Sequence, residues 1–364
     1  MRTLVVRTDR IGDVLLSTPV LSVLREQAAD CHIAALVSPY AAGAIEGHPA
    51  LDEIVVDERS GRHRGLRGFF RLVDDLRARR FDAALVLHPT ARLALACRLA
   101  GIPVRVGTGY RAYGFLFNRR VYEHRQDARK HEVDYNLSLV RVLFDRAGEA
   151  VPEIHVPEAA RRAVARRLRQ WRVLPDDPLV LLHPGSGGSA RNWPAHCFSE
   201  LAERLSHSGV RVIVTGSADE RDLVGRVAGS LPEPVIRVAG ELDIKELAAL
   251  LRASALCVTN STGPLHIAAA VGTPTVALFC PIKPCSPVRW GPFGGDHDVL
   301  MPEVPECPGS HRCIEAACPY FDCMERVSVD DVFEAVRGRL SAGHPGIAGI
   351  QGGAGGRDST VNTE

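Results

Sequence analysis

The sequence predicts an α/β protein made of two Rossmann-like, doubly wound domains in tandem. Short apolar runs of strand length alternate with longer segments of helical spacing, which is typical of a mainly parallel sheet covered by helices. This alternation starts a second time near residue 179. The chain has 364 residues, of which 46% are hydrophobic, and a chain of this size and composition can bury two cores.

The individual elements follow from periodicity and length. In the first half, strands are expected at residues 4–7, 32–37, 54–57 and 83–87, and helices at residues 14–28 and 66–79. In the second half, strands are expected at residues 180–183, 210–215, 235–238, 255–259 and 275–279, and helices at residues 195–206 and 244–253.

The boundary between the two domains is expected near residue 157. Residues 150–158 contain Pro152 and Pro157, and a basic helical segment follows them. We therefore predict an N-terminal domain at residues 1–157 and a C-terminal domain with a linker helix at residues 158–340. Residues 341–364 are rich in Gly, Ser, Asp and Thr with little to bury, which predicts a disordered tail.

Composition and charge exclude several classes of function. The formal net charge of +1 gives no reason to expect a nucleic acid partner. The N-terminus lacks the apolar core of a signal peptide, and no run approaches the ~18–20 apolar residues that span a bilayer. The sequence therefore predicts a cytoplasmic protein.

Residues 258–281 read as strand, polar turn, short helix and second strand. The turn Asn260-Ser261-Thr262-Gly263 offers cap and turn residues, and Pro264 suits the first turn of a helix. A helix that begins directly after a buried strand presents free N–H groups and the positive end of its dipole, which favours an anion. The alternative is an ordinary turn with a hydroxyl cap.

The loop after the first strand contains Asp13. It lacks the G-x-G-x-x-G spacing of a dinucleotide site, and Asp13 would repel a phosphate placed there. At the carboxyl end of a strand, Asp13 could act as a general base toward a hydroxyl group. The alternative is that Asp13 only complements a helix dipole.

A second loop, residues 183–194, also lies between a strand and a helix. Its Gly and Ser residues supply backbone and hydroxyl donors, and Arg191 supplies a guanidinium that can bind phosphate oxygens in pairs. A diphosphate fits this set of donors. The alternative is a flexible Gly/Ser linker, which the flanking strand and Trp193 disfavour.

Three motifs in this order resemble glycosyltransferase family 9, the ADP-heptose:lipopolysaccharide heptosyltransferases and their relatives. These are RTDRIGDVLLSTPVL, HPGSGGSARNWPAHCFSELAERL and VTNSTGPLHIAAAVGTPTVALFCPIKPCSPVRWGP, with KHEVDYNLSLVRVL between the first two. The resemblance implies a GT-B fold, with two Rossmann-like domains facing a central cleft. It implies an acceptor in the N-terminal domain, a nucleotide-sugar in the C-terminal domain, and an inverting transfer with no cofactor and no essential metal.

The resemblance also implies roles for single residues. Asp13 falls on the catalytic base, Ser186 and Gly187 fall in the phosphate loop, and Arg191 stands where the family commonly has Lys. Glu220 is a candidate for hydrogen bonds to the ribose, and Leu242 for packing against the base.

The turn at Asn260 departs from the family pattern. Ser261 stands where family members commonly have an acidic residue that contacts the donor sugar. A hydroxyl loses the stronger charge-assisted contacts of a carboxylate, which leaves the donor sugar open. The phosphate role of Thr262 and Gly263 is retained. His266 is a further donor-binding candidate, with a packed helix residue as the alternative.

Four of the ten cysteines lie close together late in the chain: Cys307, Cys313, Cys318 and Cys323. Their spacing lacks the C-x2-C pairs of a common zinc site. We interpret the cluster first as a local structural element that could be redox-sensitive, with a structural metal as the alternative.

The expected reaction is transfer of a heptose from ADP-heptose to a lipopolysaccharide-core or related glycan acceptor. A glycolipid acceptor would bring the protein to the cytoplasmic face of the inner membrane. The alternatives are another nucleotide-activated sugar, or a non-catalytic sugar-nucleotide-binding relative, for which Ser261 and Arg191 are the motivation. Asp13 weighs against the second alternative, because binding alone needs no base.

Overall fold

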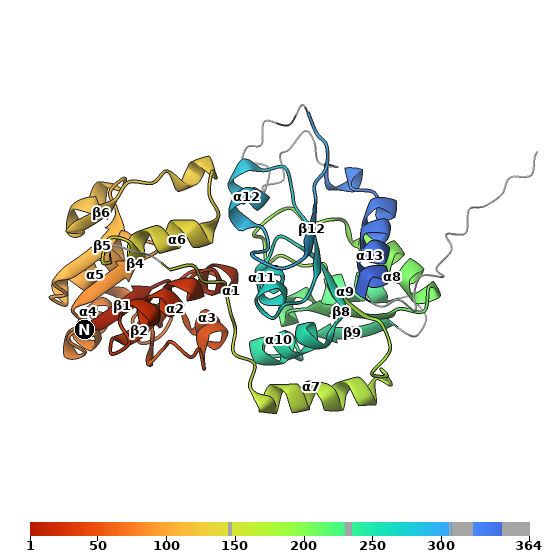
Figure 1. Ribbon diagram of the computed structural model, residues 1–364, viewed down its shortest axis with the longest axis horizontal. Helices are drawn as coiled ribbons and strands as arrows, with labels where there is room; N and C mark the ends of the chain where they lie inside the picture. The colour runs from red at the N-terminus through yellow and green to blue at the C-terminus, as the bar shows by residue number, and fades with distance from the viewer. Residues whose placement is uncertain (145–147, 230–234, 306, 308–322, 344–364) are drawn as a thin grey trace, which may run out of the picture.

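The computed structural model describes residues 1–144, 148–229, 235–305, 307 and 323–343. It consists of two six-stranded parallel sheets with helices packed on them, one sheet in each half of the chain (Figure 1). This confirms the predicted fold class.

The first sheet has the strand order β3-β2-β1-β4-β5-β6. Its strands are β1 (Arg2–Val6), β2 (His32–Val37), β3 (Glu53–Val56), β4 (Ala83–Val86), β5 (Val104–Thr108) and β6 (Arg119–Val121). The two strands that the sequence analysis missed, β5 and β6, lie at one edge and contain arginines. They bury less of their length than the central strands do, so they lack a continuous apolar run.

The helices of the first half are α1 (Ile11–Leu15), α2 (Thr18–Gln27), α3 (Pro39–Ile45), α4 (Gly65–Ala78), α5 (Ala91–Leu99) and α6 (Glu132–Val140), with 3₁₀ turns η1 (Ala112–Leu116) and η2 (Arg125–Asp127). The single helix predicted at residues 14–28 was wrong, because the structure divides it into α1 and α2. Pro19 has no N–H to continue the helical ladder onto Leu15, and the hydroxyl of Thr18 donates to the carbonyl of Leu15 instead, at 2.8 Å.

The second sheet has the order β12-β11-β10-β7-β8-β9. Its strands are β7 (Leu179–His183), β8 (Arg211–Gly216), β9 (Val235–Ala239), β10 (Leu256–Asn260), β11 (Thr275–Leu278) and β12 (His297–Leu300). The sequence analysis missed the edge strand β12, which is mostly half-buried.

The helices of the second half are α7 (Glu158–Gln170), α8 (Ala195–His207), α9 (Arg221–Ala228), α10 (Ile244–Ala253), α11 (Gly263–Ala270), α12 (Pro287–Trp290) and α13 (Val329–Gly343), with 3₁₀ turns η3 (Ala218–Glu220), η4 (Lys283–Cys285) and η6 (Cys323–Arg326). Helix α13 continues past residue 341, where the predicted tail begins, and residues 344–364 lie outside the described part of the chain. Within the described part of the chain, none of the helices combines the length and the hydrophobicity of a membrane-spanning segment.

The two halves meet through short helices at the carboxyl ends of their strands. Helix α1 contacts α11, and α3 contacts α10. In each sheet the strand order reverses at the strand that begins the half, β1 in the first and β7 in the second. Ligands of open α/β sheets bind at such reversal points, and here both points face the same interface.

Candidate active site

A cavity of about 960 Å³ lies between the two halves. Asp13 and Arg10 line it from the first half. From the second half come the loop after β7, the start of α11, and the residues around Glu220 and Leu242. The cavity therefore brings together these predicted site residues: Asp13, Ser186, Gly187, Glu220, Leu242, Ser261, Thr262, Gly263 and His266.

The loop after β7 forms one wall of the cavity. Gly187 and Gly188 have positive φ angles of 52° and 73°, which glycine adopts without strain. The side chain of Asn260 fixes this loop, because its oxygen accepts from the N–H of Trp193 at 2.9 Å and its amide donates to the carbonyl of Pro184 at 2.7 Å. The loop is therefore a fixed turn and not a flexible linker.

The start of α11 faces the same space. Strand β10 ends at Asn260 and α11 begins at Gly263, with Pro264 in its first turn. The side chain of Thr262, the N-cap residue, makes no capping hydrogen bond. The hydroxyl of Ser189 donates to the carbonyl of Ser261 at 3.1 Å, which joins the two loops. The first N–H groups of α11 thus lie beside the Gly/Ser loop, an arrangement that suits a diphosphate.

Glu220 lies beside the loop after β7. Its carboxylate accepts from the N–H of Ser217 at 2.8 Å and from the hydroxyl of Ser217 at 3.0 Å. Burial opposes ionisation of Glu220, yet the hydrogen bonds from Ser217 hold its pKa below the ordinary value. A methyl group at Gly185 would lie 1.9 Å from Oε1 of Glu220, so the glycine lets the carboxylate lie against the loop. Glu220 is therefore a fixed anionic acceptor on the cavity wall.

His183, at the end of β7, was not predicted as a site residue. Its Nδ1 lies 3.0 Å from the hydroxyl of Thr215, and burial lowers its pKa to about 4. The imidazole is thus neutral near pH 7 and lines the cavity next to Glu220.

Asp13 lies in α1, the short helix that follows β1. The Nη2 of Arg7 donates to its carboxylate at 2.5 Å. Burial raises the pKa of Asp13 above its ordinary value, and the positive charge of Arg7 opposes this increase. A carboxylate with a raised pKa is a stronger base, and Asp13 has 15% of its side chain exposed, on the cavity.

His266 packs directly against the residue before Asp13. A methyl group at Gly12 would lie 2.5 Å from Cδ2 of His266, so glycine permits this approach. Burial lowers the pKa of His266 to about 3, and its Nδ1 has no hydrogen-bond partner among the described residues. His266 is therefore a neutral group that joins α11 to α1 at the cavity.

Arg191 is the predicted site residue that does not line the cavity. Among the described residues that line it, Arg10 supplies the one lysine or arginine side chain. Arg10 belongs to the same RTDRIGD motif as Asp13, so the motif contained the signal, but the sequence analysis singled out only the carboxylate.

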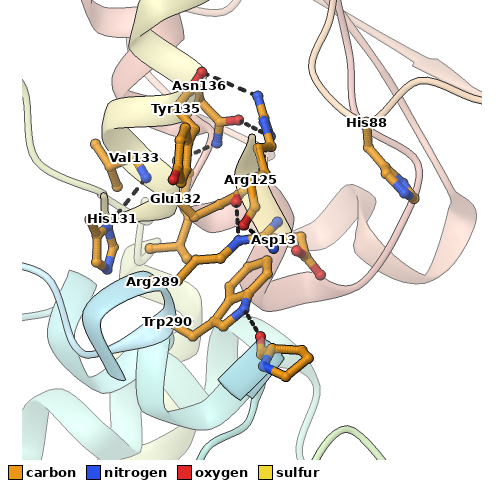
Figure 2. Close-up of polar contacts among 12 residues, drawn as sticks. Asp13, His88, Arg125, His131, Glu132, Val133, Tyr135, Asn136, Arg289 and Trp290 are labelled. Atoms are coloured by element: carbon orange, nitrogen blue, oxygen red, sulfur yellow. Dashed lines mark hydrogen bonds and ion pairs between the residues drawn. The ribbon is translucent and has the colours of Figure 1, made fainter. Parts of the chain in front are cut away.

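A buried ion network next to Asp13 was also missed. Glu132, at the start of α6, has a fully buried carboxylate that accepts from Arg7 at 2.9 Å. It also accepts from Arg125 at 2.6 Å and from Arg289 at 2.9 Å (Figure 2). Burial opposes ionisation of Glu132, but the three guanidinium groups lower its pKa to about 2. Glu132 lies in the KHEVDYN segment, and no local pattern marks a carboxylate there as buried.

The predicted cysteine cluster lies partly outside the described residues. Cys307 and Cys323 are described, and Cys313 and Cys318 are not. Within the described ranges no group of three or more His, Cys, Asp or Glu side chains is placed to hold a metal ion. The cluster as a whole therefore stays a prediction.

Comparison with known proteins gives a family match. Residues 69–314 match the model of glycosyltransferase family 9 (heptosyltransferase). The chain is 26% identical over 297 residues to lipopolysaccharide heptosyltransferase 2 of Salmonella typhimurium, which covers 78% of this chain and 84% of that protein.

Solved structures share the fold. The glycosyl transferase family 9 protein from Veillonella parvula superposes with a TM-score of 0.81 at 23% identity, covering 94% of this chain and 97% of that one. The ADP-heptose lps heptosyltransferase II of E. coli superposes with a TM-score of 0.76 at 24% identity, covering 94% and 99% of the two chains.

Proposed function

The chain belongs to glycosyltransferase family 9, and from this premise we propose that it transfers a heptose from ADP-heptose to a lipopolysaccharide-core or related glycan acceptor. The heptose and the acceptor class are inferred from the lipopolysaccharide heptosyltransferase at 26% identity. The observation that carries the proposal is the single cavity that joins Asp13 of the first half to the two anion-binding loops of the second.

On the donor side, the diphosphate of the nucleotide-sugar binds between the loop at Ser186 and Gly187 and the start of α11 at Thr262 and Gly263. The free N–H groups at the start of α11 and the dipole of that helix favour this placement. Glu220 accepts hydrogen bonds from the ribose, because its fixed carboxylate lines the same wall.

Leu242 packs against the nucleotide base, since it lines the cavity close to β9 and α10. Ser261 contacts the donor sugar. Arg191 lies outside the cavity lining, at the end of the phosphate loop, and its side chain turns toward the leaving group when the donor binds, where it contributes positive charge. His266 adds a neutral imidazole to the donor site.

On the acceptor side, Asp13 is the general base. It takes the proton of the acceptor hydroxyl as that oxygen attacks the anomeric carbon and forms the new glycosidic bond. The bond from the anomeric carbon to the diphosphate breaks on the opposite face, so the configuration inverts. The negative charge that develops on ADP is met by the N–H groups of the two loops. The raised pKa of Asp13 supports this role.

A second candidate is transfer of another nucleotide-activated sugar. The observation that favours it is Ser261, whose buried hydroxyl stands where the family commonly has a carboxylate. A hydroxyl holds sugar hydroxyls with weaker hydrogen bonds than a carboxylate does, which relaxes the preference for one sugar.

Calorimetric titration with ADP, UDP and GDP separates these candidates at the level of the nucleotide. We expect ADP to bind more tightly than UDP and GDP. Equal affinity for the three, or tighter binding of UDP or GDP, would contradict an ADP-activated donor.

A glycolipid acceptor would place the protein at the cytoplasmic face of the inner membrane, so association with the membrane is part of the proposal. The contact would be peripheral and made through the acceptor. Fractionation of cells should then show membrane-bound protein that is lost when the acceptor is not made.

A further inference from the structure

Glu132 binds three arginines from three separate parts of the chain. Arg7 follows β1, Arg125 belongs to η2, and Arg289 belongs to α12. Figure 2 shows Arg125 and Arg289 pointing at Glu132, with Asp13 close by. The side chain of Glu132 is 0% exposed and that of Arg7 is 4% exposed. Such a cluster is costly to bury, because each charge loses its water.

Arg7 connects this cluster to the proposed base. Each nitrogen of its guanidinium donates a hydrogen bond to a different carboxylate. Nε donates to Asp9 at 2.7 Å, Nη1 to Glu132 at 2.9 Å, and Nη2 to Asp13 at 2.5 Å. A planar group held at three points cannot rotate. Glu132 therefore fixes the direction in which Arg7 presents Nη2 to Asp13.

Arg289 brings the second half of the chain into the same network. Its Nε donates to Glu132 at 2.9 Å, and its Nη1 donates to the carbonyl of Arg125 at 3.1 Å. Nearby, Nε2 of His131 donates to the carbonyl of Gly291 at 3.0 Å, since Nδ1 of His131 accepts from the N–H of Val133. The network is complete only when α12 lies against α6.

We propose that Glu132 and Arg289 are positioning residues for the base: Arg289 reaches Glu132 across the domain interface, Glu132 orients Arg7, and Arg7 orients Asp13. The approach of the nucleotide-sugar domain thereby completes the environment of the base. This inference rests on the proposed role of Asp13. It adds a coupling between the arrangement of the two domains and the geometry of the reacting carboxylate.

A cluster that served only to stabilise one domain would not need these connections. Arg7 and Arg125 already supply Glu132 with counter-charges from its own half of the chain, at 2.9 and 2.6 Å. Arg289 comes from the other half, does not line the cavity, and still contacts the network at two points. The position of Arg289 therefore suits a residue that responds to the placement of the two domains better than a residue that binds the donor.

The first test uses Arg289→Gln, since Arg289 is partly exposed and the variant should fold. We expect kcat to fall at least ~10-fold, with the Kd for ADP within about twofold of wild type, because ADP binds to groups that Arg289 does not touch. Arg289→Lys keeps the charge and should recover part of the lost kcat. The control is Arg204→Gln. Arg204 pairs with Asp330, and both lie in the second half of the chain, so this variant should leave kcat unchanged.

The second measurement is the pKa of Asp13. A purely structural role of the network predicts no particular direction of change in this pKa. The charged and titratable groups around Asp13 are Arg7, Asp9, Arg10, His88, Arg125, His131, Glu132, His266 and Arg289. Removal of a cation in Arg289→Gln should raise the pKa of Asp13 and move the acidic limb of the rate profile to higher pH. Glu132→Gln removes an anion and should move the limb to lower pH.

Carboxyl NMR of aspartate-labelled protein, assigned with Asp13→Asn, measures the same two shifts without any substrate. Opposite shifts in the two variants support the proposal. An unchanged kcat and an unchanged titration in Arg289→Gln would overturn it. If Glu132→Gln does not fold, the Arg289 variants alone decide.

The inference and the proposed function fail in different ways. If Asp13→Asn transfers sugar at the wild-type rate, the proposed base is wrong. If Asp13→Asn is inactive while Arg289→Gln behaves as wild type, only the positioning role is wrong.

Discussion

Asp13 combines two properties that a general base needs. It faces the cavity, and its burial raises its pKa. We expect Asp13→Asn to bind ADP normally and to lose at least ~10²-fold in turnover, because the amide cannot accept the proton of the acceptor. Wild-type turnover in this variant would exclude Asp13 from the mechanism.

The same carboxylate sets a pH dependence. A base acts in its ionised form, so turnover should fall as the pH drops through the pKa of Asp13. Because burial raises the pKa of Asp13 above the ordinary value of an aspartate, the acidic limb should lie at higher pH than an exposed aspartate would give. The profile is measured as kcat against pH, with ADP affinity as the control for folding and binding.

Arg191 and Arg10 are the two candidate cations for the diphosphate. Arg191 does not line the cavity, but it follows the loop that does, and we expect its side chain to reach the diphosphate when the donor binds. Arg191→Ala should then weaken ADP binding by about 1.5–3 kcal/mol, the range for hydrogen bonds to charged groups. Calorimetry measures this loss, and Arg10→Ala is the matched comparison, because Arg10 lines the cavity from the other half of the chain. Unchanged affinity in Arg191→Ala with a loss in Arg10→Ala would move the role to Arg10.

Helix α3 crosses close to α10 at a glycine. A methyl group at Gly43 would lie 2.6 Å from Cγ2 of Ile244, which is closer than real side-chain contacts allow. Gly43→Ala should therefore separate the two halves at this point and lower kcat/KM for the donor on the order of tenfold. Its melting temperature should change little, because the higher helix propensity of alanine offsets part of the cost of the contact with Ile244.

Gly225→Ala is the control for this prediction. Gly225 lies in α9 with no neighbour within 4 Å of an added methyl group, so the substitution changes helix propensity alone. It should leave kcat/KM unchanged. The close contact at Gly43 would have no functional meaning if both variants kept wild-type kcat/KM.

At the scale of elements, the sequence predicted best those segments whose conformation depends on neighbouring residues in the chain. The phosphate loop and the turn at Asn260 follow buried strands and contain Gly, Ser and Pro. Their turns could therefore be predicted from the sequence. The break between α1 and α2 depends on the missing N–H of Pro19, which the apolar spacing concealed. The edge strands β5, β6 and β12 lack a long apolar run.

At the scale of the whole molecule, contacts between distant residues limited the prediction. Arg7, Glu132 and Arg289 are separated by more than a hundred residues in sequence, and each resembles a surface charge when the sequence is considered alone. Only the relative placement of the two sheets buries them together. For the same reason the sequence suggested Arg191 and not Arg10 as the cation of the cavity.

The proposed transfer needs no divalent cation. The loops at residues 186–191 and 260–263 contain no Asp or Glu to hold such an ion, and backbone N–H groups and arginine supply the positive charge instead. We expect activity to be essentially intact in EDTA. Rapid loss of turnover that Mg²⁺ or Mn²⁺ restores, with no change in melting temperature, would contradict a metal-free transfer.

The most direct test of the central claim is the product of the reaction. Wild-type protein and Asp13→Asn are each incubated with ADP-heptose and a lipopolysaccharide-core acceptor, and mass spectrometry follows the acceptor while released ADP is quantified. The account predicts an acceptor heavier by one heptose and an equal amount of ADP with the wild type, and neither with Asp13→Asn. Transfer from a UDP- or GDP-sugar in place of ADP-heptose, or equal transfer by the two proteins, would contradict it.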